Sequence, residues 1–127
     1  SFGRNLGTCF QITDDILDYS AKEKVFGKKI GNDFLEGKIT LPIILLFQKS
    51  NKIERQMLNK FFSQNIRNQD DFNKTLGLIK KYKIIETCKK RADYFSNVAA
   101  DSLSIFEKNF TIEKLQELSF YIVNRLN

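Results

Sequence analysis

The sequence contains no histidine and no tryptophan, and its 127 residues include only two cysteines and one proline. The absence of histidine removes the most common general base and excludes any Ser-His or Cys-His nucleophile pair. It also excludes a Cys/His zinc site, and two cysteines cannot form a Cys₄ site. Cys9 and Cys88 are isolated, and each lies in an apolar helical pattern. We therefore expect two buried free thiols in a protein of the reducing cytoplasm.

Long apolar runs and helix-breaking residues are also scarce. The longest apolar run, from Leu41 to Phe47, is far too short to span a bilayer, and no signal peptide is visible. Six of the seven glycine and proline residues lie in the first 42 positions, so only Gly77 interrupts the remaining 85 residues. The sequence has no strand-like alternation and no internal repeat. The pattern predicts an all-α protein, an antiparallel helical bundle with one domain over residues 1–127.

The formal net charge is +6, which makes nucleic acid or an anionic membrane surface a possible partner. The lysines are spread over many polar helix faces, however, and no basic motif with interleaved aromatic residues occurs. We therefore expect a generic basic surface and no nucleic-acid partner. Peripheral contact with a membrane is retained as a secondary possibility.

Start signals predict several helices after residue 30. Asn32 is expected to cap a short turn that Gly37 ends. Thr40 is a good N-cap for a helix over residues 41–49, because Pro42 is tolerated in a first helical turn. The pair of Asn51 and Glu54 resembles a capping box, which predicts a further helix to about residue 64.

The later helices are predicted from apolar residues at steps of three and four. Asp70 or Asp71 is expected to cap the next helix. The pattern from Ile84 to Phe106 predicts an amphipathic helix of about 24 residues. Thr111 is expected to cap the last helix. The phenylalanine stripes along these helices are predicted to be core and not a ligand channel.

Residues 2–20 are predicted to form a mostly buried helix with one narrow polar stripe. At about 100° per residue, the polar residues of this segment fall within an arc of about 120°. They are Arg4, Gly7, Thr8, Gln11, Asp14, Asp15 and Asp18. The rest of the circle is mostly apolar, so three carboxylates end a stripe that lies between apolar flanks.

This acidic cluster is costly for a helix. Asp14 and Asp18 form an i,i+4 pair of like charge, and aspartate is a poor helix former. The acids also lie near the helix C-terminus, which is the wrong end for negative charge. A bound cation would reverse the charge terms, and a site made only of oxygen atoms suits Mg²⁺. The alternative is a solvated acidic face.

Glycines and lysines follow the acids closely. The segments Gly27-Lys28-Lys29-Ile30-Gly31-Asn32-Asp33 and Glu36-Gly37-Lys38-Ile39-Thr40-Leu41-Pro42 provide flexible backbone and cations. Carboxylates for a metal followed by lysines suit a diphosphate. Together with Gly7-Thr8-Cys9-Phe10-Gln11 and Asp14-Asp15-Ile16-Leu17-Asp18-Tyr19, these segments closely resemble the second aspartate-rich region of the trans-polyprenyl diphosphate synthases. The likeness is strongest to the long-chain, octaprenyl type.

The resemblance covers only the C-terminal part of such an enzyme and implies the all-α isoprenoid synthase fold. In that family two aspartate-rich motifs face each other across a helical cavity, and no second such motif occurs here, since Asp70-Asp71 leads into a sequence that does not match. We therefore expect a C-terminal portion that lacks the first motif and the isopentenyl diphosphate site. Alone it is expected to be inactive.

The resemblance also implies roles for individual residues. Asp14, Asp15 and Asp18 would bind Mg²⁺ directly or through its waters, with Asp14 the strongest ligand. Lys28 and Lys38 would bind the diphosphate of the substrate. Gln11, one turn before Asp14, would line the cavity near the reacting carbons. Asp33 matches the family pattern, and its expected role is only to orient the lysine loop.

The implied activity is prenyl transfer, in which an allylic diphosphate is elongated with isopentenyl diphosphate to a polyprenyl diphosphate. The expected partners are these two substrates and either a second copy of the full-length enzyme, as a homodimer, or a separate N-terminal half. Two alternatives remain open. One is a non-catalytic helical subunit from a split or truncated gene, and the other is a basic helical module that binds membranes.

Overall fold

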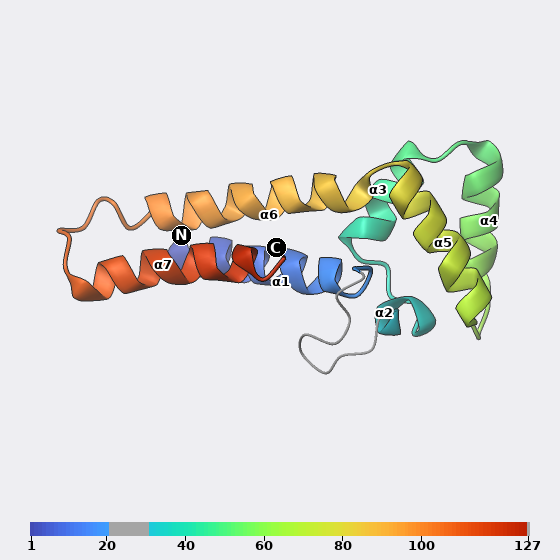
Figure 1. Ribbon diagram of the computed structural model, residues 1–127, viewed down its shortest axis with the longest axis horizontal. Coiled ribbons are helices and arrows are strands. Elements are labelled where there is room, and N and C mark those ends of the chain that lie inside the picture. The colour runs from blue at the N-terminus through green and yellow to red at the C-terminus, as the bar shows by residue number, and fades with distance from the viewer. Residues whose placement is uncertain (21–30, 127) are drawn as a thin grey trace. The chain divides into compact units, whose positions relative to one another are not determined.

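The computed structural model describes residues 1–20 and 31–126. Within these ranges the regular elements are all helices, as expected for an all-α protein (Figure 1). They are α1 (Phe2–Leu17), α2 (Asn32–Leu35), α3 (Leu41–Lys49), α4 (Lys52–Ser63), α5 (Gln69–Lys81), α6 (Ile84–Asp101) and α7 (Phe110–Asn124). None of the described helices is both long and apolar enough to cross a membrane.

The chain groups into two compact units. The first unit comprises Ser1–Asp14 and Thr87–Asn127, and the second comprises Asp15–Glu86. The boundaries therefore fall inside α1 and inside α6.

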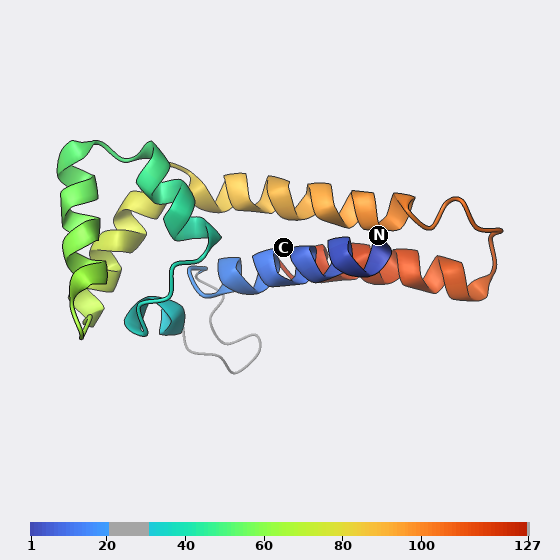
Figure 2. The ribbon, with the colours of Figure 1, turned by 180° about the vertical axis from the view of Figure 1, so that it is seen from behind.

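In the first unit, α6 and α7 run side by side in opposite directions (Figures 1 and 2). Buried Ser96 on α6 donates a hydrogen bond to the carbonyl oxygen of Ser119 on α7 at 2.8 Å. Further along the same pair, the side-chain amide of Gln116 donates to the carbonyl oxygen of Ala100 at 3.1 Å. These bonds satisfy polar groups that would otherwise be costly to bury between two helices.

The two cysteines are buried in this first unit, and both are free thiols. This confirms the prediction from their apolar surroundings. Burial raises the pKa of the Cys9 thiol above its ordinary value, so Cys9 stays protonated and behaves as a small apolar residue.

The second unit has an aromatic core centred on Phe34 of α2, which is fully buried. The ring of Phe34 lies 6.3 Å from Phe61, 5.4 Å from Phe62 and 5.6 Å from Phe72, measured between ring centroids. The ring of Tyr19, just after α1, lies 5.9 Å from the ring of Phe72 and extends this cluster. Tilted and edge-on pairs at these separations are favourable in addition to their burial. The cluster therefore anchors the short α2 against α4 and α5.

Two predicted helix starts are confirmed. Helix α3 has the predicted bounds 41–49 and proline in its first turn, and Thr40 stands at the N-cap position, although its side chain makes no capping hydrogen bond. The capping box of α4 is present, because Glu54 N–H donates to Asn51 Oδ1 at 2.8 Å and Asn51 N–H donates to Glu54 Oε1 at 2.9 Å. In both cases the start signal is local in sequence, so the pattern alone was sufficient.

Three predicted caps are wrong. Asn68, not Asp70 or Asp71, caps α5, because Asp71 at the third helical position completes a capping box with Asn68. Asn109, not Thr111, caps α7 through a 2.9 Å bond from the N–H of Ile112. Asn32 is the first residue of α2 and its N-cap is Gly31. In each case the cap lies one to three residues earlier, since a residue inside the first turn resembles a cap in sequence.

Two predicted helices are shorter than expected. Helix α1 ends at Leu17, and residues 18–20 form turns and a bend instead of a last helical turn. Helix α6 has 18 residues and ends at Asp101, because the following residues form turns closed by side-chain bonds from Ser102 and Ser104 to carbonyl oxygens. Serine side chains that bond to the local backbone in this way compete with the helix.

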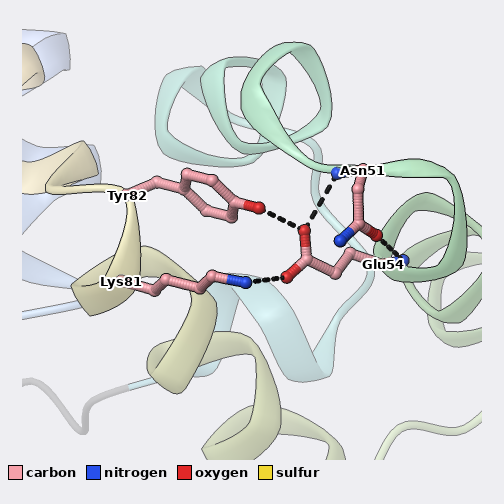
Figure 3. A network of polar contacts seen from close by, with 4 residues as sticks. All are labelled: Asn51, Glu54, Lys81 and Tyr82. Atoms are coloured by element: carbon pink, nitrogen blue, oxygen red, sulfur yellow. Dashed lines mark hydrogen bonds and ion pairs between the residues drawn. The ribbon is translucent and has the colours of Figure 1, made fainter.

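A polar network joins the start of α4 to the end of α5 (Figure 3). Glu54 accepts hydrogen bonds from Lys81 Nζ at 2.7 Å, from the Tyr82 hydroxyl and from the backbone N–H of Asn51. The lysine and then the tyrosine are the main reasons why the pKa of Glu54 falls to about 2. The same pairing raises the pKa of Lys81. The carboxylate of Glu54 thus completes the N-terminal cap of α4 and binds two residues at the end of α5.

This network predicts an acid-sensitive contribution to stability. The pKa of Glu54 is lower in the folded state than in the unfolded state, so its contribution is fully present above about pH 5 and is lost as pH falls toward 2. Glu54→Gln should therefore lower the free energy of unfolding at pH 7, and the difference from wild type should shrink between about pH 4.5 and 2. Urea denaturation at a series of pH values measures this.

The control is the same substitution in a Lys81→Met background. There the pH-dependent difference should be smaller, because the main cause of the low pKa has been removed. A difference between Glu54→Gln and wild type that does not change from pH 7 to pH 2 would contradict the assignment.

Candidate functional site

The predicted acidic stripe lies on α1 and the turn after it, and burial increases along it. Gln11 is exposed, Asp14 is half-buried, and Asp15 and Asp18 are 7% and 1% exposed. The last turn of α1 contains no basic residue that would offset these charges. The burial of Asp15 and Asp18 contradicts the alternative of a solvated acidic face at these two positions, because a charged carboxylate is left buried only where other groups stabilise it.

Asp18 is bound to the turn that starts α2. Its Oδ2 accepts a hydrogen bond from the backbone N–H of Asp33 at 3.0 Å, in a buried contact. Its backbone carbonyl accepts from the N–H of Gly31 at 2.9 Å. Two bonds therefore fix the end of the aspartate segment to a turn that begins thirteen residues later in the sequence. A charge-assisted bond of this kind fixes the orientation of the carboxylate.

The same turn presents Lys38. The Lys38 N–H donates to the carbonyl oxygen of Asp33 at 2.9 Å, which closes the turn after α2. Lys38 Nζ lies 3.7 Å from Asp33 Oδ1 and 3.6 Å from Glu36 Oε2. The lysine side chain is 61% exposed while that of Asp33 is 8% exposed. The pair with Glu36 is exposed on both sides and contributes little to stability, so Lys38 can exchange this partner for another anion at small cost.

Tyr19 lies among the carboxylates and is 4% exposed. Burial raises the pKa of its hydroxyl far above the ordinary value, and the charges of Asp18, Asp33 and Asp15 raise it further. The tyrosine therefore stays neutral at physiological pH. The shift also means that these three carboxylates act on one small region of the second unit.

Two glycines with positive φ bound α2. Gly31 has φ +84° and Gly37 has φ +78°, a region that costs side-chain-bearing residues energy. A Cβ on Gly31 would lie 2.9 Å from the ring of Phe72. The aromatic core and the backbone conformation therefore both require glycine at position 31, where the turn meets Asp18.

The metal site predicted from the sequence consists of Asp14, Asp15 and Asp18. Within residues 1–20 and 31–126, no three of the cysteine, aspartate and glutamate side chains gather closely enough to hold a metal ion. The donors that lie near the turn are all oxygen atoms, which fits a hard cation such as Mg²⁺. Mg²⁺ usually keeps several waters and uses one or two carboxylates with substrate phosphates, so three gathered carboxylates are not required. The three-aspartate ligand set stays a prediction.

The structure describes five of the six predicted site residues. Lys28 lies outside the described residues. Sequence reasoning gave Asp33 a minor role, whereas its backbone bonds to Asp18 and its carboxylate pairs with Lys38. It did not identify Tyr19 or Phe34 as support for the site. The only local signal for these two was their position beside the acidic and glycine segments.

The sequence of this chain is similar to those of known prenyl synthases. A model of the polyprenyl synthetase family matches residues 1–79. The chain is 30% identical over 124 residues to octaprenyl diphosphate synthase of Haemophilus influenzae, covering 98% of this chain and 37% of that protein. It is 32% identical over 126 residues to a prenyl transferase of Porphyra purpurea, covering 99% of this chain and 38% of the relative.

Solved structures show the same similarity. A polyprenyl synthase from Caulobacter crescentus, complexed with calcium and isoprenyl diphosphate, superimposes with a TM-score of 0.90 at 32% identity, covering 99% of this chain and 38% of that one. Octaprenyl pyrophosphate synthase from Helicobacter pylori gives 0.83 at 35% identity, covering 98% and 39%. The chain thus spans less than two-fifths of the length of these relatives.

The packing at Gly31 makes a prediction with a matched control. Gly31→Ala should lower the free energy of unfolding by about 2–4 kcal/mol, because it combines a strained φ with overpacking against Phe72. Gly77→Ala, in the interior of α5 with nothing within 4 Å of its added Cβ, should instead raise it by about 0.5–1 kcal/mol. Urea denaturation measures both. Equal effects of the two substitutions would mean that Gly31 has no special role.

Proposed function

The chain belongs to the polyprenyl synthetase family, and on that premise we propose that it supplies one diphosphate-binding site of a prenyltransferase. The observation that carries the proposal is the buried bond between Asp18 Oδ2 and the N–H of Asp33, which joins the carboxylate segment to the turn that presents Lys38. Carboxylates for a metal and a lysine for phosphate oxygens are the two components that a diphosphate site requires.

The proposed reaction elongates an allylic diphosphate with isopentenyl diphosphate. The allylic C–O bond to diphosphate breaks, the resulting carbocation forms a C–C bond with the double bond of isopentenyl diphosphate, and a proton is lost. Because negative charge develops on the departing diphosphate, positive groups aimed at it lower the barrier most. Mg²⁺, when bound, would supply most of this charge stabilisation.

Individual residues of this chain would have separate roles in this reaction. Asp14, Asp15 and Asp18 would hold Mg²⁺ directly or through water, and the N–H of Asp33 would keep Asp18 oriented. Lys38 would leave Asp33 and Glu36 to bind diphosphate oxygens, and Lys28 would bind them from the preceding segment. Gln11, on the same face of α1, would lie near the reacting carbons.

We propose further that this site is the second of two, and that the chain corresponds to the C-terminal part of its relatives. The first aspartate motif and the isopentenyl diphosphate site would then belong to the rest of the enzyme. The chain spans less than two-fifths of its relatives, which is consistent with this division. A cytoplasmic homodimer of the whole enzyme is the expected assembly. The second candidate is a non-catalytic helical subunit of a truncated or split gene.

The first test removes one proposed metal ligand. Asp14→Asn in the protein at its native length should reduce prenyl transfer at least about 10³-fold, because the diphosphate loses charge stabilisation as it departs. Incorporation of labelled isopentenyl diphosphate measures the rate. The matched control is Asp70→Asn, which changes an exposed aspartate in the other Asp-Asp pair of the sequence. Its rate should stay close to that of wild type.

Near-normal turnover in Asp14→Asn would refute the metal assignment. If the wild-type protein binds inorganic pyrophosphate with Mg²⁺ and yet transfers no prenyl group, the non-catalytic subunit is the correct reading of the chain.

A further inference from the structure

A guanidinium group covers the turn immediately before Lys38. Gly37 has φ +78°, and a Cβ on it would lie 2.6 Å from Nη2 and 2.8 Å from Cζ of Arg67. Arg67 lies thirty positions later, in the connection between α4 and α5. The guanidinium thus occupies the space beside the backbone from which Lys38 starts. A side chain at position 37 would force the guanidinium to move and would adopt an unfavourable φ.

Arg67 is itself held in place. Its Nη1 donates to the carbonyl oxygens of Phe61 and Gln64, at the end of α4. These carbonyls lack helical partners at a helix C-terminus, and a cation near them is favourable. Arg67 therefore connects a fixed helix end to the Gly37 turn, and both lie in the second unit.

This arrangement is more than a helix cap. The buried Nε of Arg67 has no hydrogen-bond partner among the described residues, so the side chain is placed at an unfavourable cost. Within the same ranges, no carboxylate lies within ion-pair distance of its guanidinium. The charge of Arg67 is thus not neutralised locally, and it lies close to the backbone that carries a proposed phosphate-binding lysine.

We propose that Arg67 is a positioning residue for Lys38, which holds the Gly37 turn so that the lysine starts from one fixed place. The inference rests on the proposed function of Lys38 as a ligand of diphosphate. Arg67 acts on the turn through the planar guanidinium, which bonds to the end of α4 while three of its atoms lie within 3.3 Å of the position that a Cβ on Gly37 would take. A lysine at position 67 has no such plane.

The test measures binding of inorganic pyrophosphate in the presence of Mg²⁺ by calorimetry, on the protein at its native length. Arg67→Met and Arg67→Lys should each weaken binding by about five- to tenfold, because a misplaced ligand loses affinity even when it is present. Arg55→Met is the matched control. Arg55 also donates to two backbone carbonyls, those of Phe47 and Gln48, but its bonds lie at the end of α3 and not at the turn.

Thermal unfolding separates positioning from stability. Arg67→Met and Arg55→Met should lower the midpoint of thermal unfolding by similar amounts. Only the substitutions at Arg67 should change the affinity for pyrophosphate. Equal affinities in Arg67→Met and Arg55→Met would overturn the proposal. Unchanged affinity in Arg67→Lys would also overturn it, since the charge alone would then be sufficient. If Arg67→Met does not fold, Arg67→Lys, which keeps the aliphatic stem, decides the question.

A separate pair of variants tests the premise. Lys38→Ala should weaken pyrophosphate binding by about tenfold, and Lys74→Ala, an exposed lysine on α5, should leave it unchanged. If Lys38→Ala has no effect, the proposed function of Lys38 fails. If Lys38→Ala weakens binding and the Arg67 variants do not, only the inference about Arg67 fails.

Discussion

The hydrogen bond from the N–H of Asp33 to the carboxylate of Asp18 is the contact on which the second unit depends. A buried carboxylate is stable only where donors reach it, and the donors here belong to the backbone of a short turn. That turn has too few residues to be stable by itself. It is held by Phe34 in the aromatic core and by two glycines whose φ values other residues adopt only at a cost. The packing of Phe34 thus fixes the position of the Asp33 N–H, and this N–H fixes the carboxylate of Asp18.

Negative charge is concentrated at the end of α1 and in the turn after it. Three aspartates stand at the C-terminal end of α1 and beyond it, where the helix dipole disfavours them, and no basic residue lies in the last turn. Burial is the main cause of the high pKa of Tyr19, and the charges of Asp18, Asp33 and Asp15 raise it further. Lys38, with its exposed side chain, is the group in the described turn best able to move toward an anion.

Local signals in the sequence were sufficient for the helical class, for the bounds of α3 and for the Asn51–Glu54 capping box. They failed at Asn68 and Asn109, because a first-turn residue and a true cap differ by only a few positions. The acidic stripe on α1 was recognisable from helical periodicity and from the family resemblance. The role of Asp33 and the contact between Arg67 and Gly37 were not, since these contacts join residues fifteen and thirty positions apart. Such pairings depend on how Phe34 packs, which no local pattern specifies.

The central claim is that this chain binds a diphosphate through a divalent cation. The most direct measurement is a calorimetric titration of the wild-type protein, at its native length, with inorganic pyrophosphate in Mg²⁺ and again in EDTA. The account predicts saturable binding of one pyrophosphate at this site in Mg²⁺ and its loss in EDTA. Absence of binding in Mg²⁺, or equal binding in EDTA, would contradict it.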